Sequence, residues 1–361
     1  FSYWEKDAFL QPWDLIVTGA GIVGLSSALF YKRSRPGARV LVLDKGFLPE
    51  GASTRNAGFA CIGSIGEHVA DMEMESAEGI KERIDRRYRG LQLLRATLGD
   101  EIIRYEPSGG YELFTSEEKF NEVSEFIPLF NSWLKELTGE KDVYEQTHLN
   151  GYPVISNRLE GMLHPGRMMQ ALAELTIREG VDIRWNSPVA EVSAEGPLRL
   201  VNGMELVCEQ LLVATNGFTP QLLPDVAIQP GRGLVMVTNE QQELPWKGTF
   251  HHDRGYIYFR NLGNRLLIGG ARNRAREEEA TNQFGVNPVI KKHLCAFVDE
   301  VLQLPSGWNI DYEWSGIMGF TSTKTPIIRR LDSTRVVAAG LSGMGIAIGM
   351  QVGKEAAGLL V

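Results

Sequence analysis

The sequence predicts an α/β protein (α+β overall), in which short buried strands alternate with helices. Three apolar runs support this prediction, at residues 14–18, 211–215 and 336–339, and each leads into a turn that contains glycine. Such runs are typical of strands that are buried on both faces of a parallel sheet. Residues 229–270 are instead rich in β-forming residues, and 255–260 alternate as an antiparallel strand does. We therefore expect one α/β domain built from separated pieces, with a second domain inserted.

The composition is that of a globular protein and limits the kinds of partner that the protein could bind. Hydrophobic residues make up 43% and charged residues 23% of the 361 residues, and the net charge is −8 without a long basic run. These values argue against disorder and against a nucleic-acid partner. No apolar run reaches the ~18 residues of a membrane-spanning helix. The three cysteines are far apart and form no CxxC pair, so we expect no metal site, and reduced thiols fit a cytoplasmic protein. Because the chain starts at Phe1 rather than Met, the loss of a targeting segment stays open.

The first turn carries the pattern Gly19-Ala20-Gly21-Ile22-Val23-Gly24. In this pattern the first glycine allows a tight turn, the second lets a pyrophosphate approach the backbone, and the third lets helix and strand pack closely. Asp44 follows a second buried strand at residues 39–43, where a carboxylate can accept hydrogen bonds from ribose hydroxyls. Because these parts occur in the correct order, we expect a dinucleotide site. The alternative is a strand–helix turn that contains glycines by chance.

Three further segments offer groups that a dinucleotide needs. The polar segment 51–58 supplies hydroxyl and backbone donors, and an ordinary surface loop is its alternative interpretation. Segment 213–217 ends a buried strand. Segment 340–345 joins the last strand to a helix that we expect to begin at residues 342–346. That helix N-terminus would stabilise negative charge, although a tight strand–helix turn is also typical of this pattern.

Taken together, these motifs resemble those of the D-amino acid oxidase, glycine oxidase and sarcosine oxidase family of FAD-dependent oxidoreductases. The resemblance extends over nearly the whole chain and includes landmarks at residues 164–166, 229–233, 268–270 and 325–328. It implies a Rossmann-like FAD-binding domain with GR2-type flavoprotein topology and an inserted, mainly antiparallel β-sheet substrate domain with helices. The FAD-binding domain is expected at 1–85, 150–220 and 318–361, and the substrate domain at 86–149 and 221–317.

The resemblance also implies FAD and the residues that would bind it. Some relatives tether FAD to a cysteine near the positions that match 319–323. This chain has no cysteine there, so we expect noncovalent FAD and interpret Cys61 as a small buried residue rather than a tether. The positions expected at the cofactor are Gly19, Gly21, Ile22, Val23, Gly24, Asp44, Lys45, Ser53, Thr54, Arg55, Asn56, Ala57, Gly58, Val189, Ala214, Thr215, Asn216, Gly217, Gly233, Gly340, Ser342, Gly343, Met344, Gly345 and Ile346.

The reaction implied by the resemblance is oxidation of a C–N bond in an amine or amino acid. A hydride passes to flavin N5, the resulting imine hydrolyses, and O2 or another acceptor takes the electrons. No side-chain base is obligatory in such a reaction. Two alternatives are an NAD-dependent Rossmann dehydrogenase, which leaves segments 214–217 and 340–345 unexplained, and a non-enzymatic, redox-responsive flavin-binding protein.

The substrate side departs from the family at two positions. Relatives that act on small amino acids hold the carboxylate with an arginine where this chain has Met318, and a thioether cannot form that bidentate pair. Either Arg260 or Arg272 takes the role, or the substrate lacks a carboxylate there. The latter resembles the branch that acts on larger amines, such as γ-glutamylputrescine oxidoreductases. The oxygen-activating lysine of the sarcosine oxidase branch is matched by Leu267.

Aromatic and histidine side chains complete the candidate pocket. Tyr256 and Tyr258 lie on the alternating strand that would cover the flavin, and sheet packing is their alternative role. His251 and His252 are neighbours on a strand and therefore point to opposite faces, so we expect structural histidines rather than a catalytic pair. The amphipathic stretch 117–137 is interpreted as one helix packed on a core.

Overall fold

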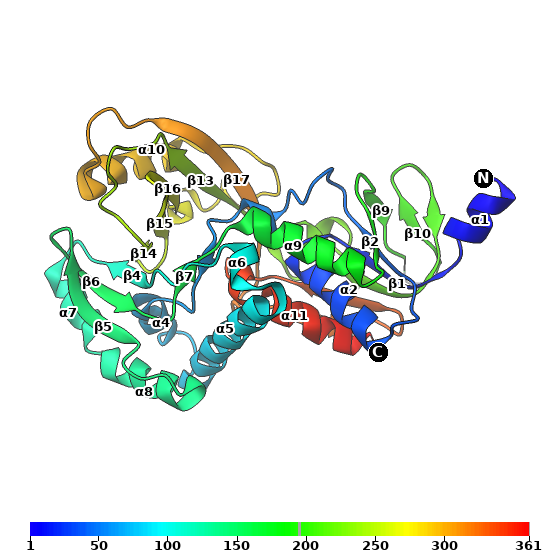
Figure 1. Cartoon of the computed structure of the whole chain (residues 1–361), viewed down its shortest axis with the longest axis horizontal. Helices are drawn as coiled ribbons and strands as arrows, with labels where there is room; N and C mark the ends of the chain where they lie inside the picture. The colour runs from blue at the N-terminus through cyan, green and yellow to red at the C-terminus, as the bar shows by residue number, and fades with distance from the viewer. Residues whose placement is uncertain (194–195, 361) are drawn as a thin grey trace. The chain divides into compact units, whose positions relative to one another are not determined.

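The computed structural model describes residues 1–193 and 196–360 (Figure 1). Their contacts divide the chain into two compact units. The first comprises 1–54, 166–231 and the residues from 317 onward, and the second comprises 55–165 and 232–316. Of the domain boundaries expected from the sequence, at 85, 150, 220 and 318, the last lies within one residue of a division between these units, and the other three lie farther from one. One reason is that β3 (Phe59–Ala60) pairs with β7 (Gly161–Met162) inside the second unit. The expected boundaries stay a prediction.

The first unit is built on a six-stranded sheet in the order β18-β19-β12-β1-β2-β8. Strand β1 (Trp13–Thr18) pairs in parallel with β12 (Cys208–Val213) and with β2 (Val40–Leu43), while edge strand β18 runs antiparallel to β19. The other elements are α1 (Tyr3–Phe9), α2 (Ile22–Ser34), α3 (Ala52–Arg55), α9 (Pro165–Arg178), β8 (Asp182–Arg184), β9 (Val189–Glu191), β10 (Leu198–Leu200), β11 (Glu205–Leu206), the 3₁₀ helix η1 (Asn216–Gln221), β18 (Ile327–Arg330), β19 (Arg335–Ala339) and α11 (Gly345–Leu359).

Both faces of this sheet are covered. The meander β9–β10–β11 packs on one face through an apolar cluster that includes Trp13, Leu198 and Val337. Helices α2 and α11 contact the sheet and lie against each other (Figure 1). They approach closely because Gly349 faces Ile22, where a Cβ on the glycine would lie 2.5 Å from the isoleucine Cγ2. Burial of the strands on both sides explains their nearly continuous apolar sequences.

The second unit is built on an eight-stranded sheet in the order β17-β13-β16-β15-β14-β4-β6-β5. Strands β14 and β4 pair in parallel, whereas the pairs β13–β16, β16–β15, β15–β14, β4–β6 and β6–β5 are antiparallel. Its strands are β4 (Gly110–Leu113), β5 (Tyr144–Leu149), β6 (Tyr152–Asn157), β13 (Gln229–Thr238), β14 (Thr249–His252), β15 (Ile257–Leu262), β16 (Arg265–Gly270) and β17 (Ile310–Phe320). Its helices are α4 (Ile65–Asp71), α5 (Ala77–Leu98), α6 (Asp100–Ile103), α7 (Glu117–Ser124), α8 (Ile127–Thr138), η2 (Arg272–Ala275), α10 (Pro288–Phe297) and the π-helical turn η3 (Val298–Leu302).

The main core of this unit lies between the sheet and helix α10. Phe250 and Phe259 stack with ring centroids 4.7 Å apart, and Trp246 meets both rings edge-on. Leu294 and Phe297 of α10 belong to the same buried cluster. A smaller cluster on other residues of the same strands contains Ala57, Val235, Val237 and Leu267, with Phe59, Tyr258 and Trp314 packed against it. Alternate residues of β15 therefore serve two separate apolar clusters.

Three local expectations are wrong in detail. The stretch 117–137 forms two helices, α7 and α8, because Pro128 begins a helix readily but disrupts a helix interior. The predicted strand at 255–260 begins instead at Ile257, since Gly255 has φ +83° within a turn. The polar segment 51–58 contains the one-turn helix α3 rather than only a loop.

Candidate functional site

The parallel strands of the first unit end at one edge of the sheet. Thr18 is in register with both Leu43 and Val213, and Val213 is in register with Val337. The segments that follow these strands therefore emerge side by side: 19–24, 44–45, 214–217 and 340–345. In an open α/β sheet, the carboxyl ends of the strands are where ligands bind.

The Gly19–Gly24 turn is shaped by close backbone contacts. Gly19 has φ +102°, and a Cβ on it would lie 2.7 Å from the Ala214 carbonyl oxygen. A Cβ on Gly24 would collide with the carbonyl oxygen of Gly19. Gly21 caps helix α2 without a side-chain hydrogen bond, and the N–H of Ile22 donates to Ser53 Oγ at 3.0 Å.

Asp44 is held in place by backbone donors. Its Oδ2 accepts from the Ala20 N–H and its Oδ1 from the Gly46 N–H, each at 2.8 Å. Burial raises the pKa of Asp44, and the two backbone hydrogen bonds oppose that shift. Each oxygen keeps lone-pair capacity for a ribose hydroxyl. Next to it, the Lys45 ammonium lies 3.3 Å from the centre of the Phe218 ring.

Asn216 joins segment 214–217 to segment 340–345. Asn216 has φ +45°, and its Oδ1 accepts from the Gly340 N–H at 3.1 Å. Ser342 has φ +47° and donates its backbone N–H to Gly319 at 2.9 Å. Helix α11 begins at Gly345, slightly later than expected, and Met344 caps it without a side-chain hydrogen bond. Its first N–H groups are thus directed out of the helix end, as in anion-binding sites.

These residues fit a flavin dinucleotide. The residues that cap α2 and α11, Gly21 and Met344, make no side-chain hydrogen bond to their helices, and the buried Thr54 Oγ1 has no hydrogen-bond partner among the described residues. A pyrophosphate and an electron-rich ring system would use such donors, and the carboxylate of Asp44 would accept from a ribose. This donor and acceptor set would hold FAD at the carboxyl edge of the sheet.

Four of the expected cofactor residues, Arg55 to Gly58, lie in the second unit. Arg55 Nη1 donates to the Ser315 carbonyl at 3.1 Å, and its guanidinium lies over the Phe284 ring. The Gly58 N–H donates to Asn56 Oδ1 at 2.8 Å, while Ala57 is buried in the smaller cluster. Gly233 is buried within β13. Val189 lies in β9 of the first unit, where it pairs with Leu200. Their cofactor role stays a prediction.

The expected pocket residues of β15 face the smaller cluster. Tyr258 and Arg260 alternate with the core residues Ile257 and Phe259, so they lie on the other face of the sheet. Arg260 is in register with Leu267. Burial raises the pKa of Tyr258 to about 12, so its hydroxyl stays protonated at neutral pH. Tyr256 lies before the strand and accepts from Arg276 Nη2 at 3.3 Å.

Arg260 is a buried cation whose Nε makes no hydrogen bond to any residue that the structure describes. It is 5% exposed, and burial lowers its pKa to about 10, with an opposing contribution from Glu106. A Cβ on Gly58 would lie 3.2 Å from Arg260 Nη2, so the guanidinium lies against the end of segment 51–58. Arg272 belongs to η2, and burial lowers its pKa as well. A buried guanidinium of this kind favours an anionic ligand.

Met318 lies in β17 beside the 340–345 segment. Its sulfur is 3.9 Å from the position that a Cβ on Gly343 would take, and its carbonyl packs against Gly217. The side chain next to the 340–345 segment at this point is therefore an uncharged thioether.

The sequence did not indicate one cluster that the structure brings together. His251 contacts Cys61 and Glu160, while His252 points the other way, with Nδ1 2.9 Å from the Leu113 carbonyl oxygen. The opposite orientation of the two histidines is confirmed. Cys61, Glu160 and His251 are each about 90 residues or more apart in sequence, so spacing rules could not connect them.

The comparison with protein families identifies the chain. The model of a family described as "DAO: FAD dependent oxidoreductase" matches residues 14–359. The chain belongs to this family. Membership confirms the expected FAD cofactor, the enzyme class and the predicted fold class, and it does not favour the NAD-only or non-enzymatic alternatives.

The relatives are distant but cover most of the chain. The probable oxidoreductase OrdL of Haemophilus influenzae is 26% identical, over 93% of this chain and 80% of the relative. The gamma-glutamylputrescine oxidoreductase of Escherichia coli K12 is 25% identical, over 96% and 83%. Among solved structures, the glycine oxidase of Bacillus cereus has a TM-score of 0.74 at 18% identity, with 96% of this chain and 94% of that chain covered. These structures share the fold.

Among the described residues, no helix is both long and apolar enough to cross a bilayer.

Proposed function

We propose that this FAD-dependent oxidoreductase oxidises a C–N bond in an amine or amino acid whose carboxylate is bound by Arg260. FAD, when bound, supplies the hydride acceptor for the carbon that carries the amine. The protein's own task is to bind and orient the substrate and to keep the reacting region dry. The product would be an imine that water hydrolyses.

The observation that carries this proposal is the state of Arg260. This guanidinium is 5% exposed, and its Nε has no hydrogen-bond partner in the described part of the chain. Such a group is costly to bury unless a ligand pairs with it. A carboxylate satisfies a guanidinium through two parallel hydrogen bonds. Phe59 and Tyr258 lie on the same side of the sheet as Arg260, with ring centroids 5.6 Å apart, and supply an apolar wall that excludes water.

Met318 supports a carboxylate position that differs from that of small amino-acid oxidases. Its thioether next to Gly343 offers no charge for a carboxylate near that loop. A substrate that carries no carboxylate close to this loop suits the uncharged thioether better. The gamma-glutamylputrescine oxidoreductase among the relatives acts, by its name, on a larger amine of this kind.

No side chain is assigned as a general base. Tyr258 holds its proton at neutral pH, because burial raises its pKa to about 12. The reaction therefore requires the amine to bind in its uncharged form, and the apolar wall favours that form over the ammonium.

The test uses the purified holoenzyme and a panel of amines with and without carboxylates, scored by anaerobic bleaching of the flavin absorbance. Arg260→Met is expected to raise KM for carboxylate-bearing substrates about 10- to 100-fold, the effect of losing a charged hydrogen bond. Amines without a carboxylate should react as before. Arg265→Met, at the half-buried start of the neighbouring strand β16, where the arginine pairs with Asp311, is the matched control. If Arg260→Met impairs the reaction of substrates with and without a carboxylate equally, Arg260 does not bind the substrate carboxylate.

The proposal also includes the electron acceptor of the reaction and the cellular location of the enzyme. The acceptor is O2 or another electron acceptor, and Leu267 at the position of the oxygen-activating lysine favours the latter. Comparing oxygen consumption with dye reduction at matched substrate distinguishes an oxidase from a dehydrogenase. Reduced, unpaired cysteines fit a cytoplasmic enzyme with noncovalent FAD.

A further inference from the structure

Three ligand-type side chains from distant segments meet inside the second unit. Cys61 follows β3, Glu160 lies between β6 and β7, and His251 belongs to β14. The cysteine sulfur, a carboxylate oxygen and an imidazole nitrogen all lie within 4.8 Å of one another. Cys61 is 5% and Glu160 1% exposed, so the cluster is shielded from solvent.

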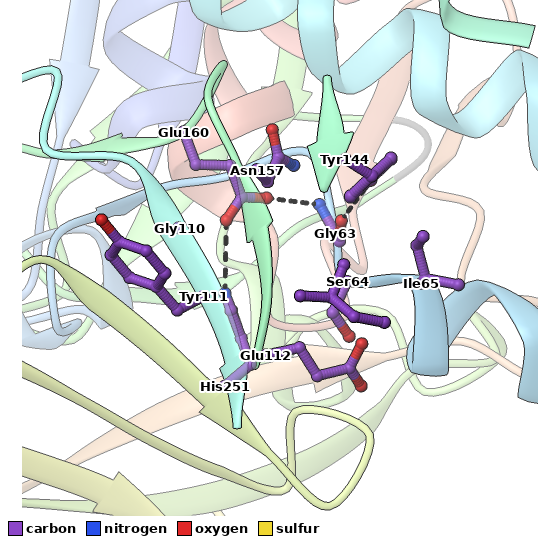
Figure 2. A pocket seen from close by; sticks show the side chains of 11 residues that line it. Gly63, Ser64, Ile65, Gly110, Tyr111, Glu112, Tyr144, Asn157, Glu160 and His251 are labelled. Atoms are coloured by element: carbon purple, nitrogen blue, oxygen red, sulfur yellow. Dashed lines mark hydrogen bonds and ion pairs between the residues drawn. The ribbon is translucent and has the colours of Figure 1, made fainter. Parts of the chain in front are cut away.

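The backbone orients the glutamate toward the histidine. Glu160 Oε1 accepts from the N–H groups of Ile62 and Gly63 at 2.9 and 3.0 Å. This leaves Oε2 directed at His251, with 3.6 Å between Oε2 and Nε2. Figure 2 shows the carboxylate between the Gly63 backbone on one side and His251 on the other. Gly110 makes room for it, since a Cβ there would collide with Oε2.

Polar atoms around the cluster have no hydrogen-bond partner among the described residues. His251 Nε2 is buried and lies just beyond hydrogen-bond distance of Glu160, and the Asn157 amide nitrogen is also buried without a partner. Asn157 is 4% exposed and lines the same small cavity as Glu160 and His251 (Figure 2). The cavity has room for about one water molecule.

We propose that Cys61, Glu160 and His251 form a binding site for one divalent cation of the zinc class, with a water in the adjacent cavity as fourth ligand. Thiolate, imidazole and carboxylate are the ligands that zinc prefers. In a tetrahedral zinc site such ligand atoms lie roughly 3.4–3.6 Å apart, by the usual bond lengths. The separation of Glu160 and His251 already has this value. The Glu160 hydrogen bonds to the backbone are the outer-shell support that ligating carboxylates usually have.

Cation binding at this cluster is coupled to proton release. Burial opposes a charge on His251, but the adjacent Cys61 and Glu160 raise its pKa well above the ordinary value. Burial raises the pKa of the Cys61 thiol. A divalent cation binds the thiolate and the neutral imidazole, so the protons that these two groups hold are displaced and leave to solvent. The cation, the thiolate and the carboxylate together then carry no net charge.

The proposed cation site is a feature beyond the proposed oxidation, and a bound cation would also restrain the side chains that pack against the cluster. It joins three segments of the second unit that are separate in sequence. The Phe59 ring meets His251 and Tyr258 edge-on, at 5.2 and 5.6 Å between centroids. A cation that fixes His251 would therefore fix the aromatic wall beside Arg260.

The test measures metal in the purified holoenzyme after equilibration with zinc sulfate and gel filtration. We expect about one zinc per chain by mass spectrometry, the stoichiometry of a single tetrahedral site. His251→Gln and Cys61→Ala should lose it. His252→Gln and Cys295→Ala are matched controls that should retain it, because both residues lie outside the cluster. The flavin-to-protein ratio and the melting temperature without zinc show whether each variant is folded.

A second measurement keeps the proposal falsifiable if the variants unfold. The double variant Cys208→Ala/Cys295→Ala keeps Cys61 as its single thiol. Cobalt(II) added to it should produce the near-ultraviolet thiolate-to-cobalt absorption and tetrahedral visible bands. Zinc should also raise the melting temperature by several degrees. A protein that takes up neither metal overturns the site, as does a cobalt spectrum without thiolate absorption. Failure of these tests leaves the proposed substrate chemistry untouched.

Discussion

The carbonyl oxygen of Gly19 lies where a Cβ of Gly24 would be. This contact joins the first turn of helix α2 to the loop that leaves β1, so the helix N-terminus is held directly at the end of the strand. The same loop is kept against the neighbouring strand end, where a Cβ on Gly19 would lie 2.7 Å from the Ala214 carbonyl. Glycine at these positions sets the geometry that a pyrophosphate requires.

The Gly24→Ala variant is therefore expected to lose both stability and cofactor. The added methyl group must displace backbone rather than a flexible side chain, which should cost about 2 kcal/mol or more of unfolding free energy. The flavin-to-protein ratio after purification and urea unfolding measure the two effects. Gly358→Ala is the matched control, because that glycine is in helix α11 with no atom near its Cβ position. It should raise stability by up to about 1 kcal/mol. Equal behaviour of the two variants would contradict the close-packing argument.

Asp44→Asn is expected to weaken FAD binding without unfolding the protein. The amide keeps one acceptor for the two N–H donors of Ala20 and Gly46 but brings an NH2 group against the other. The loss of one charged acceptor for a ribose should lower the affinity of the apoprotein for FAD about 10- to 100-fold. Fluorescence titration of the apoprotein with FAD measures this. Asp182→Asn, an exposed carboxylate on β8, should bind FAD as the wild type does. An unchanged affinity in Asp44→Asn would mean that Asp44 does not contact the cofactor.

The buried carboxyl of Glu112 predicts that the difference in stability between Glu112→Gln and the wild type changes with pH. Burial raises its pKa from the ordinary 4.5 to about 7, although the Gly66 N–H donates to its Oε2 at 2.8 Å and opposes the shift. A raised carboxyl pKa gives a stabilising contribution that is complete below pH 4.5 and is lost as the pH rises through 7. Glu112→Gln cannot ionise. Its unfolding free energy minus that of the wild type should rise by on the order of 3 kcal/mol between pH 4 and 8.

The measurement is chemical unfolding at several pH values with EDTA present, which keeps the neighbouring Cys61–Glu160–His251 cluster free of metal. Glu145→Gln makes the same substitution at an exposed position of β5 and is the control for the loss of a surface carboxylate. A pH-independent difference for Glu112→Gln would show that the carboxyl does not titrate in this range.

The cofactor edge could be predicted from the sequence because its signals are local. Gly19, Gly24 and Asp44 each occupy a position that the strand–turn–helix order explains, and parallel pairing then brings the strand ends together. Segment 340–345 was recognised in the same way, although helix α11 begins at Gly345 and leaves Ser342 in a left-handed conformation. Turn chemistry depends on few neighbouring residues, so a single sequence contains it.

The second unit could not be predicted to the same depth because its contacts are long-range. The pairing of β14 with β4 joins residues about 140 positions apart and places His251 beside Glu112. The cysteine near β3 and Glu160 near β7 meet only because those two strands pair. Arg260 was one of two candidate arginines, and its burial is a property of the folded sheet that alternation alone could not supply.

Arg260 and Arg232 should respond oppositely to the same substitution. Arg232 makes two short hydrogen bonds, at 2.7 and 3.0 Å, to Glu279, which is 1% exposed. Arg232→Met leaves that carboxylate buried without its partner and should lower the unfolding free energy by about 3–5 kcal/mol. Arg260 has no such partner within residues 1–193 and 196–360, and burial lowers its pKa to about 10, which means that the fold holds its charge at a cost. Arg260→Met should therefore leave stability unchanged or raise it by about 1–3 kcal/mol.

Urea unfolding of both variants without substrate measures this difference in stability. A gain in stability combined with a raised KM for carboxylate substrates is typical of a group kept for binding, because the ligand supplies the missing partner. A large loss of stability in Arg260→Met would instead assign that guanidinium to the core.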